Sequence, residues 1–350
     1  MSAAARRTAA VLREPTAARR IPYAAHVSET VVKTHAGDYV QAFRLAGVSF
    51  ESADDETLNN WHERLNVTWR NIASRNVALW THVVRRRERT VPGAFAGDGF
   101  ADRLARRYRE RLAGETLMVN ELYLSIVYRP VAGSVSGLAS KLYLRRAGAD
   151  AAAELADALE ACAKIGQTLA AALARYEPES LGLEERNGRT YSRLLEFLAQ
   201  LVNAEYQPVP LPRAPVNEVL ATSRPLFGTE VIEYRLPAET RLGAMLGIKE
   251  YPTPTIVGLF NALLSAPFAF VLTQSFAFLT KATAQGLLQR QSARMANAGD
   301  FAVTQAAELT DALDALTGNE FVMGDHHFTL QVLAEEAPVE EGEPEAGRLR

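Results

Sequence analysis

One segment of this chain restricts its possible folds more than any other feature. No Asp, Glu, Lys or Arg occurs from Tyr251 to Thr280. This uncharged segment is longer than the roughly 20 residues that a helix needs to cross a bilayer. The segment is therefore either a membrane span or a deeply buried part of a globular domain.

The pattern inside this segment favours burial in a protein core. Pro267 lies in the middle and would break a spanning helix, and Asn261 and Gln274 would need polar partners in hydrocarbon. Residues 268–279 alternate with a period of two and are largely apolar on both faces, which is typical of a central strand covered on both sides. We therefore expect a short helix over residues 254–265, followed by a buried central strand.

Strand and helix patterns occur in the same order on both sides of the middle of the chain. Residues 21–130 and residues 226–335 each predict the order β-β-α-β-α-β. Several predicted strands are joined by hairpins, which is typical of α+β folds with helices on one face of mainly antiparallel sheets. We therefore expect an α+β fold with two such halves, and the repeated order suggests an internal duplication.

Residues 131–225 are expected to separate the two halves as a helical insertion. An alanine-rich pattern over residues 151–175 and a second apolar pattern over residues 191–205 each predict a helix. Residues 206–225 contain five prolines. This proline content favours a connecting strap over a helix or a strand.

The two ends of the chain are expected to be tails. Residues 1–20 hold five arginines and one acid, and we expect a disordered basic tail rather than an organellar transit peptide. The segment from Glu335 carries six glutamates. We expect residues 336–350 to form a solvated acidic tail.

The composition restricts location and function. The formal net charge is −3, so the chain as a whole has no attraction to nucleic acid or anionic lipid. The single cysteine, Cys162, excludes an internal disulfide and fits a reducing cytoplasm. Because Cys162 lies on the apolar stripe of the helix predicted over residues 151–175, we expect a core thiol and not a nucleophile.

The sequence contains no recognisable set of catalytic or cofactor-binding residues. Neither a Gly-rich loop ending in Gly-Lys-Ser/Thr nor a dinucleotide-binding fingerprint occurs. His326 and His327 are adjacent on a predicted strand, so their side chains should point to opposite faces and cannot ligate one ion together. We therefore expect no catalytic, cofactor-binding or metal-ligating residue in this chain.

The arginines between residues 85 and 111 are the strongest candidates for contacts with a partner. This segment contains nine arginines and four acids, and it suits a phosphate group, an acidic partner or an anionic membrane surface. A solvated helix face is the alternative, because the chain is acidic and aromatic residues do not alternate with the basic ones. The candidate contact residues are Arg85, Arg86, Arg87, Arg89, Arg106, Arg107, Arg109 and Arg111.

Several motifs in the second half resemble one protein family. They are K-E-Y-P-x-x-T at residues 249–255, "LTQSF" at 272–276, "LQRQ" at 288–291, "ELTDALDAL" at 308–316 and "FVMGDHHFTL" at 321–330. Together they are similar to the N-terminal portion of the CagE/TrbE/VirB family, the large ATPases of bacterial type IV secretion and conjugation. The first half fits more loosely, through "NELYLSIVYRP" at 120–130. By pattern the resemblance covers about residues 20–335.

The resemblance implies a function that the residues alone do not indicate. In this family the N-terminal region precedes a RecA-like motor that binds ATP and magnesium, so the motor is expected beyond residue 350 and no cofactor is expected in this chain. The family implies location in the bacterial cytoplasm, peripheral to the inner membrane, without a transmembrane segment. It also implies contacts with inner-membrane components of the channel and with neighbouring protomers.

These considerations support one leading interpretation and two alternatives. The leading interpretation is a docking and assembly domain of an ATPase that energises export of DNA or protein. The first alternative is an ATP-binding enzyme, as part of a longer parent chain. The second is a peripheral nucleic-acid-binding domain that uses Arg85–Arg111. Whether the chain is itself an enzyme is left open.

Overall fold

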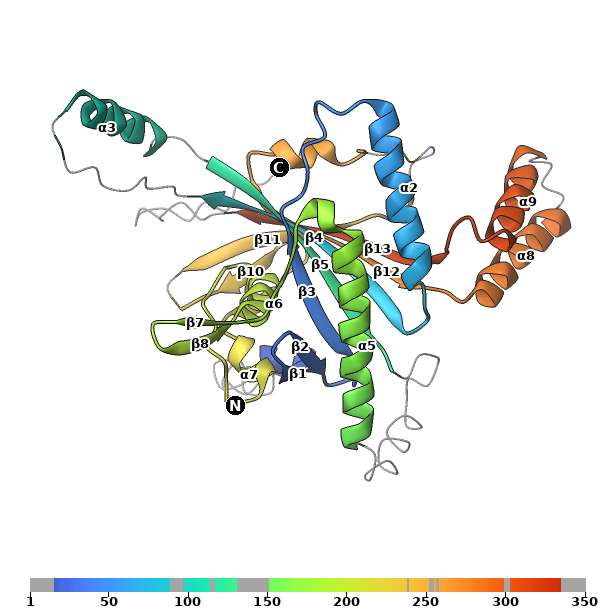
Figure 1. Ribbon diagram of the computed structural model, residues 1–350, viewed down its shortest axis with the longest axis horizontal. Coiled ribbons are helices and arrows are strands. Elements are labelled where there is room, and N and C mark those ends of the chain that lie inside the picture. The colour runs from blue at the N-terminus through green and yellow to red at the C-terminus, as the bar shows by residue number, and fades with distance from the viewer. Residues whose placement is uncertain are drawn as a thin grey trace, which may run out of the picture.

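A single antiparallel sheet joins the two halves of the chain (Figure 1). The computed structural model describes residues 16–88, 97, 99–113, 117–130, 151–237, 239–251, 255, 258–298 and 303–334. The sheet has 11 strands in the order β1-β2-β3-β5-β4-β12-β13-β11-β10-β9, with β6 added beside β3. The predicted α+β class is confirmed.

The elements follow the chain in three groups. The first half contains β1 (Tyr23–Ser28), β2 (Val31–Thr34), β3 (Tyr39–Leu45), α2 (Asp55–Ile72), β4 (Val77–Glu88), α3 (Phe100–Ala113) and β5 (Leu117–Tyr128). The middle contains α5 (Ala151–Ala172), β6 (Pro178–Ser180), β7 (Leu183–Arg186), β8 (Arg189–Ser192), α6 (Arg193–Asn203) and α7 (Val216–Leu220). The second half contains β9 (Arg224–Phe227), β10 (Ile232–Arg235), β11 (Thr240–Gly247), β12 (Ala269–Phe278), α8 (Lys281–Ala298), α9 (Val303–Thr317) and β13 (Gly324–Ala334).

The uncharged segment contributes the central strand that its alternation predicts. β12 pairs with β4 on one side and with β13 on the other, and Phe270 is fully buried. Among residues 258–265, the expected helix is limited to a turn and a short 3-10 helix at Asn261–Ser265, while much of residues 252–257 lies outside the described part. Across the described residues, no helix has both the length and the hydropathy to span a membrane.

The two halves have the same strand order when each is followed from the contact between β4 and β12 to the edge of the sheet. One half runs β4-β5-β3-β2-β1 and the other β12-β13-β11-β10-β9. The connection from β4 to β5 carries α3, and the corresponding connection from β12 to β13 carries α8 and α9. A duplication would produce this arrangement, and the duplication itself stays a prediction.

Helices cover both faces of the first-half sheet, although we expected them on one face. Leu124 packs in a cluster with Leu169 of α5, whereas the neighbouring Tyr123 stacks on Phe197 of α6 at 4.3 Å between ring centroids. Consecutive residues of a strand point to opposite faces. α5 and α6 therefore lie on opposite sides of the sheet.

Three further sequence predictions are wrong in detail. The first strand in the order predicted for residues 21–130 is in fact a hairpin of two strands, because residues 29–30 turn the chain between β1 and β2. The proline-rich strap contains α7 and β9, because Pro215 precedes the first helical residue and Pro225 lies in an edge strand, where proline is tolerated. Part of the expected basic tail forms a 3-10 helix at Ala17–Arg20, while residues 1–15 and 335–350 lie outside the described residues.

α5 packs closely on β3, as its small residues allow. Cys162 is fully buried, and burial raises the pKa of its thiol to about 11, so the prediction of a core thiol is confirmed. The Gln41 side-chain amide donates to the Cys162 carbonyl at 2.7 Å. Gly166, one turn further on, allows this approach because a Cβ there would lie 3.1 Å from Gln41 Oε1.

We expect Gly166→Leu to lower the free energy of unfolding by about 1–3 kcal/mol, because the added side chain overpacks the contact between α5 and β3. Gly286 of α8 is the matched control, since a Cβ there meets no atom within 4 Å. Urea denaturation of both leucine variants measures the difference. Equal stabilities would show that α5 does not need a small residue at this position.

Candidate interaction surface

The arginines predicted to share one surface lie in three different environments. Arg85 is 7% exposed and inside the fold. Its Nε donates to the Ala266 carbonyl at 2.6 Å, and its Nη1 donates to the Leu264 carbonyl at 2.7 Å and to Asn120 Oδ1 at 2.8 Å. Arg85 therefore connects β4 to the segment before β12 and presents no charge to a partner.

Arg86, the next residue along β4, points to the opposite face and into a charged cluster. It donates to Glu88 at 2.6 Å and to Glu121 of β5 at 3.0 Å. Glu121 also accepts from the Tyr123 hydroxyl at 3.2 Å and lies 3.5 Å from Arg44 of β3. The hydrogen bond to Glu121 raises the pKa of Arg86, and burial followed by the charge of Glu121 raises the pKa of Tyr123.

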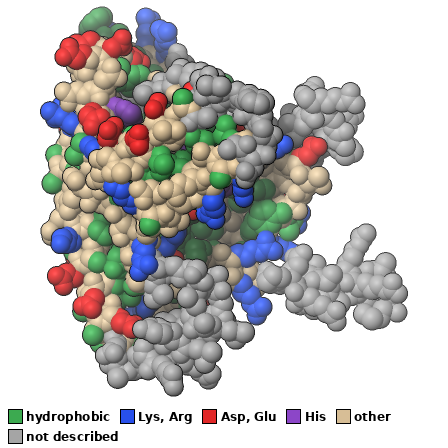
Figure 2. Space-filling view, turned by 90° about the vertical axis from the view of Figure 1, so that its right-hand side faces the viewer, with side chains coloured by type: hydrophobic (Ala, Val, Ile, Leu, Met, Phe, Trp, Pro, Cys, Tyr) green, Lys and Arg blue, Asp and Glu red, His purple; other side chains and the backbone are tan. Residues whose placement is uncertain are grey.

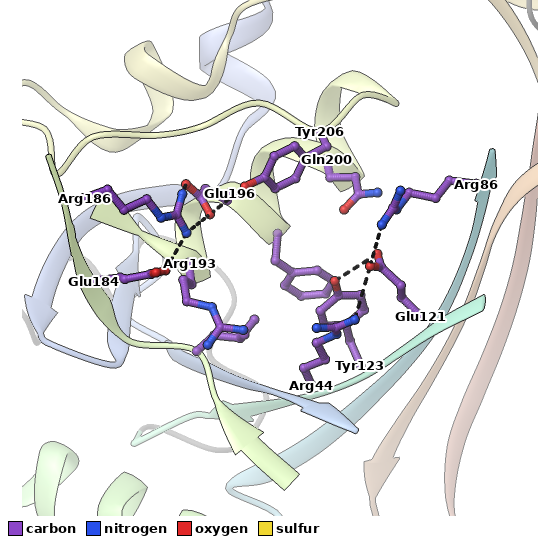
Figure 3. A pocket seen from close by; sticks show the side chains of 12 residues that line it. Arg44, Arg86, Glu121, Tyr123, Glu184, Arg186, Arg193, Glu196, Gln200 and Tyr206 are labelled. Atoms are coloured by element: carbon purple, nitrogen blue, oxygen red, sulfur yellow. Dashed lines mark hydrogen bonds and ion pairs between the residues drawn. The ribbon is translucent and has the colours of Figure 1, made fainter. Parts of the chain in front are cut away.

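A second charged cluster faces the first one across a cavity (Figure 3). Its centre is Glu196 of α6, whose side chain is 4% exposed. Glu196 accepts two hydrogen bonds from Arg186 of β7, at 2.7 and 3.2 Å, and one from the Tyr206 hydroxyl at 3.1 Å. Arg186 also donates to Glu184 at 2.6 Å, and this bond followed by the one to Glu196 raises the pKa of Arg186.

The space between the clusters is a cavity of about 590 Å³. Four arginines and three glutamates line it together with five uncharged residues; the lining residues are Arg44, Arg86, Glu121, Tyr123, Leu181, Glu184, Arg186, Arg193, Glu196, Phe197, Gln200 and Tyr206. Each of the four arginines has a glutamate partner, Arg193 pairing with Glu179 just outside. Preorganised and paired charges of this kind suit recognition of a polar or charged segment.

The ionisable side chains of this cavity are held by one another. Its lining contains no His, Cys, Ser or Lys, and its glutamates and tyrosines take part in the ion pairs and hydrogen bonds of the two clusters. Within the described residues, no group of three His, Cys, Asp or Glu side chains could hold a metal ion. His326 and His327 bind different partners, Gln274 and Thr329 respectively, which agrees with their predicted opposite directions.

The remaining predicted arginines lie at the end of β4 and on α3. Arg87 borders a smaller cavity of about 230 Å³, and Arg89 lies outside the described residues. α3 projects away from the sheet (Figure 1) and carries the last four; these are Arg106, Arg107, Arg109 and Arg111. The sequence prediction thus joined residues that the fold separates.

Sequence reasoning missed the residues that form the second cluster. Glu196 lies in the apolar run "RLLEFLAQLVN" of α6, and Gln200 follows four residues later on the same side of the helix. A buried acid needs a buried or partly buried cation. The glutamate inside an apolar helix was therefore a usable signal, whereas its partner Arg186 could not be identified without the β7–β8 hairpin.

Charges of both signs are interspersed on the side of the molecule shown in Figure 2. Acidic side chains gather toward one corner of this view, and basic side chains lie among hydrophobic ones near its middle. A continuous basic groove, which nucleic-acid binding favours, is not visible among the described residues on this side.

Two family models match separate parts of the chain. Residues 30–135 match the model of the type IV secretion system ATPase VirB4/TrbE, N-terminal domain. Residues 179–339 match the model of the CagE, TrbE, VirB family, component of type IV transporter system. The two matched ranges contain both charged clusters.

Curated relatives match nearly the whole chain. The type IV secretion system protein virB4 of Bartonella quintana is 36% identical over 317 residues, which are 90% of this chain and 40% of the relative. The protein of the same name from Brucella melitensis is 36% identical over 323 residues, 90% and 39% respectively. The type IV secretion system protein PtlC of Bordetella pertussis is 36% identical over 320 residues, 89% and 38%. The chain thus spans about two fifths of the length of these relatives.

Proposed function

Because this chain belongs to the CagE/TrbE/VirB family of type IV transporter components, we propose that it is a docking and assembly domain of a type IV secretion ATPase. The observation that carries the proposal is the cavity of paired charges between the sheet and α6. Fixed charges in a cavity select a partner of complementary charge.

The partner that fits this cavity is a protein segment with acidic side chains. Arg44 is the most exposed of the four arginines in the lining, with 47% of its side chain exposed, and its contact with Glu121 is long, at 3.5 Å. Arg44 can therefore leave its 3.5 Å contact with Glu121 for a partner's carboxylate at little cost. We place this partner among the inner-membrane components of the secretion channel and the chain itself at the cytoplasmic face of the inner membrane.

ATP and magnesium belong, in this proposal, to a motor region of the parent protein. The chain contains no Gly-Lys-Ser/Thr loop to hold phosphates. Nucleic-acid binding through Arg85–Arg111 is less well supported, because Arg85 is buried and α3 also carries Asp102 and Glu110. Whether the exported substrate is DNA or protein does not affect the docking role.

Capture from detergent-solubilised membranes of cells that carry a type IV secretion system tests the proposal. We expect the tagged chain to recover inner-membrane proteins of that system, and we expect Arg44→Glu to lower the recovery about tenfold, since it reverses a charge at the cavity. Arg213→Glu is the control, because Arg213 is exposed and outside the cavity. Failure to recover any of the system's proteins would overturn the docking role. Recovery unaffected by Arg44→Glu would overturn the cavity as its surface.

A further inference from the structure

α3 exposes a stripe of large apolar side chains that nothing in the described structure covers. Phe100, Leu104 and Tyr108 are spaced by four residues, which places them on one side of the helix, and they are 76, 57 and 60% exposed. α3 projects from the sheet (Figure 1). Contiguous exposed apolar side chains mark contact sites in soluble proteins.

A basic stripe runs beside this apolar one. Arg103, Arg107 and Arg111 have the same four-residue spacing, one position before Leu104, Tyr108 and Leu112. The side chains of Arg103 and Arg107 make no hydrogen bond or ion pair with a described residue. α3 as a whole holds five arginines against two acids.

α9 presents the opposite charge. Glu308, Asp311 and Asp314 are exposed and spaced by three residues, and α9 contains no basic residue. Leu309 and Leu316, which the helical period places on the other side, are partly and fully buried. None of the three carboxylates has a hydrogen-bond or ion-pair partner among the described residues.

The two helices occupy corresponding places at opposite ends of the molecule. α3 connects β4 to β5, and the α8–α9 pair connects β12 to β13. Figure 1 shows α3 projecting at one side of the sheet and the α8–α9 pair at the other. One copy of the chain therefore cannot bring its own α3 onto its own α9.

We propose that α3 of one copy docks on α9 of a second copy, with the arginines of α3 against the carboxylates of α9. Burial of the apolar stripe adds to the affinity, and α8, which packs on α9, carries an exposed apolar side chain at Leu287, 39% exposed. The charges set orientation and partner choice. A contact between two different surfaces is heterologous, so its repetition builds a ring or a filament. The inference goes beyond docking at the channel and does not use the charged cavity.

Sedimentation velocity of the 350-residue chain over a range of protein concentrations tests the proposal. We expect the wild type to associate, and we expect Arg103→Glu with Arg107→Glu to raise the dissociation constant at least about tenfold. Glu308→Lys with Asp311→Lys should have the same effect. High salt should weaken association of the wild type, since the exposed ion pairs are screened. All four positions are exposed, so both double variants should keep the wild-type melting temperature.

A mixture of the two double variants gives the sharpest result. Each variant alone has like charges on α3 and α9, but in the mixture α3 of either variant meets an oppositely charged α9 on the other variant. We therefore expect the mixture to regain the association that each variant alone has lost, with the two variants alternating along the assembly. The control variant, Arg189→Glu with Arg213→Glu, reverses two exposed arginines elsewhere and should associate like the wild type.

Three outcomes would overturn the proposal. They are a wild type that stays monomeric at every concentration, a mixture of the two double variants that does not associate, and a control variant whose self-association is weakened as much as that of the double variants. Flotation with vesicles of anionic phospholipid adds a further arm. If the α3 variant alone loses vesicle binding while the wild type does not self-associate, α3 is a membrane contact instead. Arg44→Glu should leave self-association unchanged, which separates this test from that of docking at the channel.

Discussion

Arg85→Ala is expected to lower the free energy of unfolding by about 3–4 kcal/mol. Arg85 donates to two backbone carbonyls and to Asn120 from a position that is 7% exposed. Hydrogen bonds from a charged group contribute more than neutral ones, and a buried acceptor left without a donor costs a further desolvation penalty. The expected loss is therefore well above that of an ordinary surface substitution.

Urea denaturation of Arg85→Ala, Arg85→Lys and Arg107→Ala measures this effect. Arg85→Lys should restore part of the stability at most, because one ammonium group cannot reach all three acceptors as the planar guanidinium does. Arg107 is exposed and has no partner among the described residues, so Arg107→Ala should change stability by no more than about 0.5 kcal/mol. Equal stabilities of Arg85→Ala and Arg107→Ala would contradict the structural role of Arg85.

The contrast between Arg85 and Arg107 shows how far composition can identify a surface. Both residues lie in one arginine-rich segment of the sequence. Alternation along β4 places Arg85 and Arg86 on opposite faces, and only the long-range position of residues 264–266 makes the Arg85 face an interior one. Local charge density therefore predicted partner contacts without distinguishing structural arginines from exposed ones.

Local signals predicted the individual elements well. The period-two pattern located β12, and Asp54, a residue type favoured at helix N-caps, is the N-cap of α2. Its side chain accepts a hydrogen bond from the Thr57 amide at 2.7 Å, which is the usual geometry of an N-cap aspartate. Such contacts join residues a few positions apart, so the sequence alone contains the information needed to predict them.

The pairing of distant elements could not be predicted in the same way. β4 and β12 pair across the whole middle of the chain, and no local pattern specifies which of two buried strands will be neighbours. β7 and β8 have four residues each, too few for a clear alternation to stand out. The charged cavity depends on both features, since its two clusters come from the sheet and from the β7–β8 and α6 region.

Acidification is expected to destabilise the fold through His82, which lies where the two halves meet. His82 of β4 is 3% exposed, and its Nδ1 lies 3.0 Å from the Thr273 hydroxyl of β12. Its ring neighbours are Phe197 and Trp80, which are uncharged. Burial lowers the pKa of His82 to about 4, from 6.5 for an ordinary histidine.

The lowered pKa determines the direction of the pH dependence. Between about pH 6.5 and pH 4 the unfolded chain binds a proton at His82 and the folded chain does not, so the free energy of unfolding falls as the pH falls through this window. This difference in the pKa of His82 between the unfolded and the folded chain corresponds to a change of about 3 kcal/mol in the free energy of unfolding. Urea denaturation at several pH values should show that the free energy of unfolding depends less steeply on pH for His82→Gln, whose side chain does not titrate.

His26→Gln separates this contribution from that of a partly buried histidine. Burial also lowers the pKa of His26, but its hydrogen bond to the Ser28 carbonyl opposes that shift. His26→Gln should therefore remove a smaller part of the slope than His82→Gln. Amide hydrogen exchange should add a local signal, because a charge at His82 weakens the β4–β12 contact first and exposes those two strands. If the free energy of unfolding of His82→Gln depends on pH as steeply as that of the wild type, the pH dependence arises from other residues and not from the contact between β4 and β12.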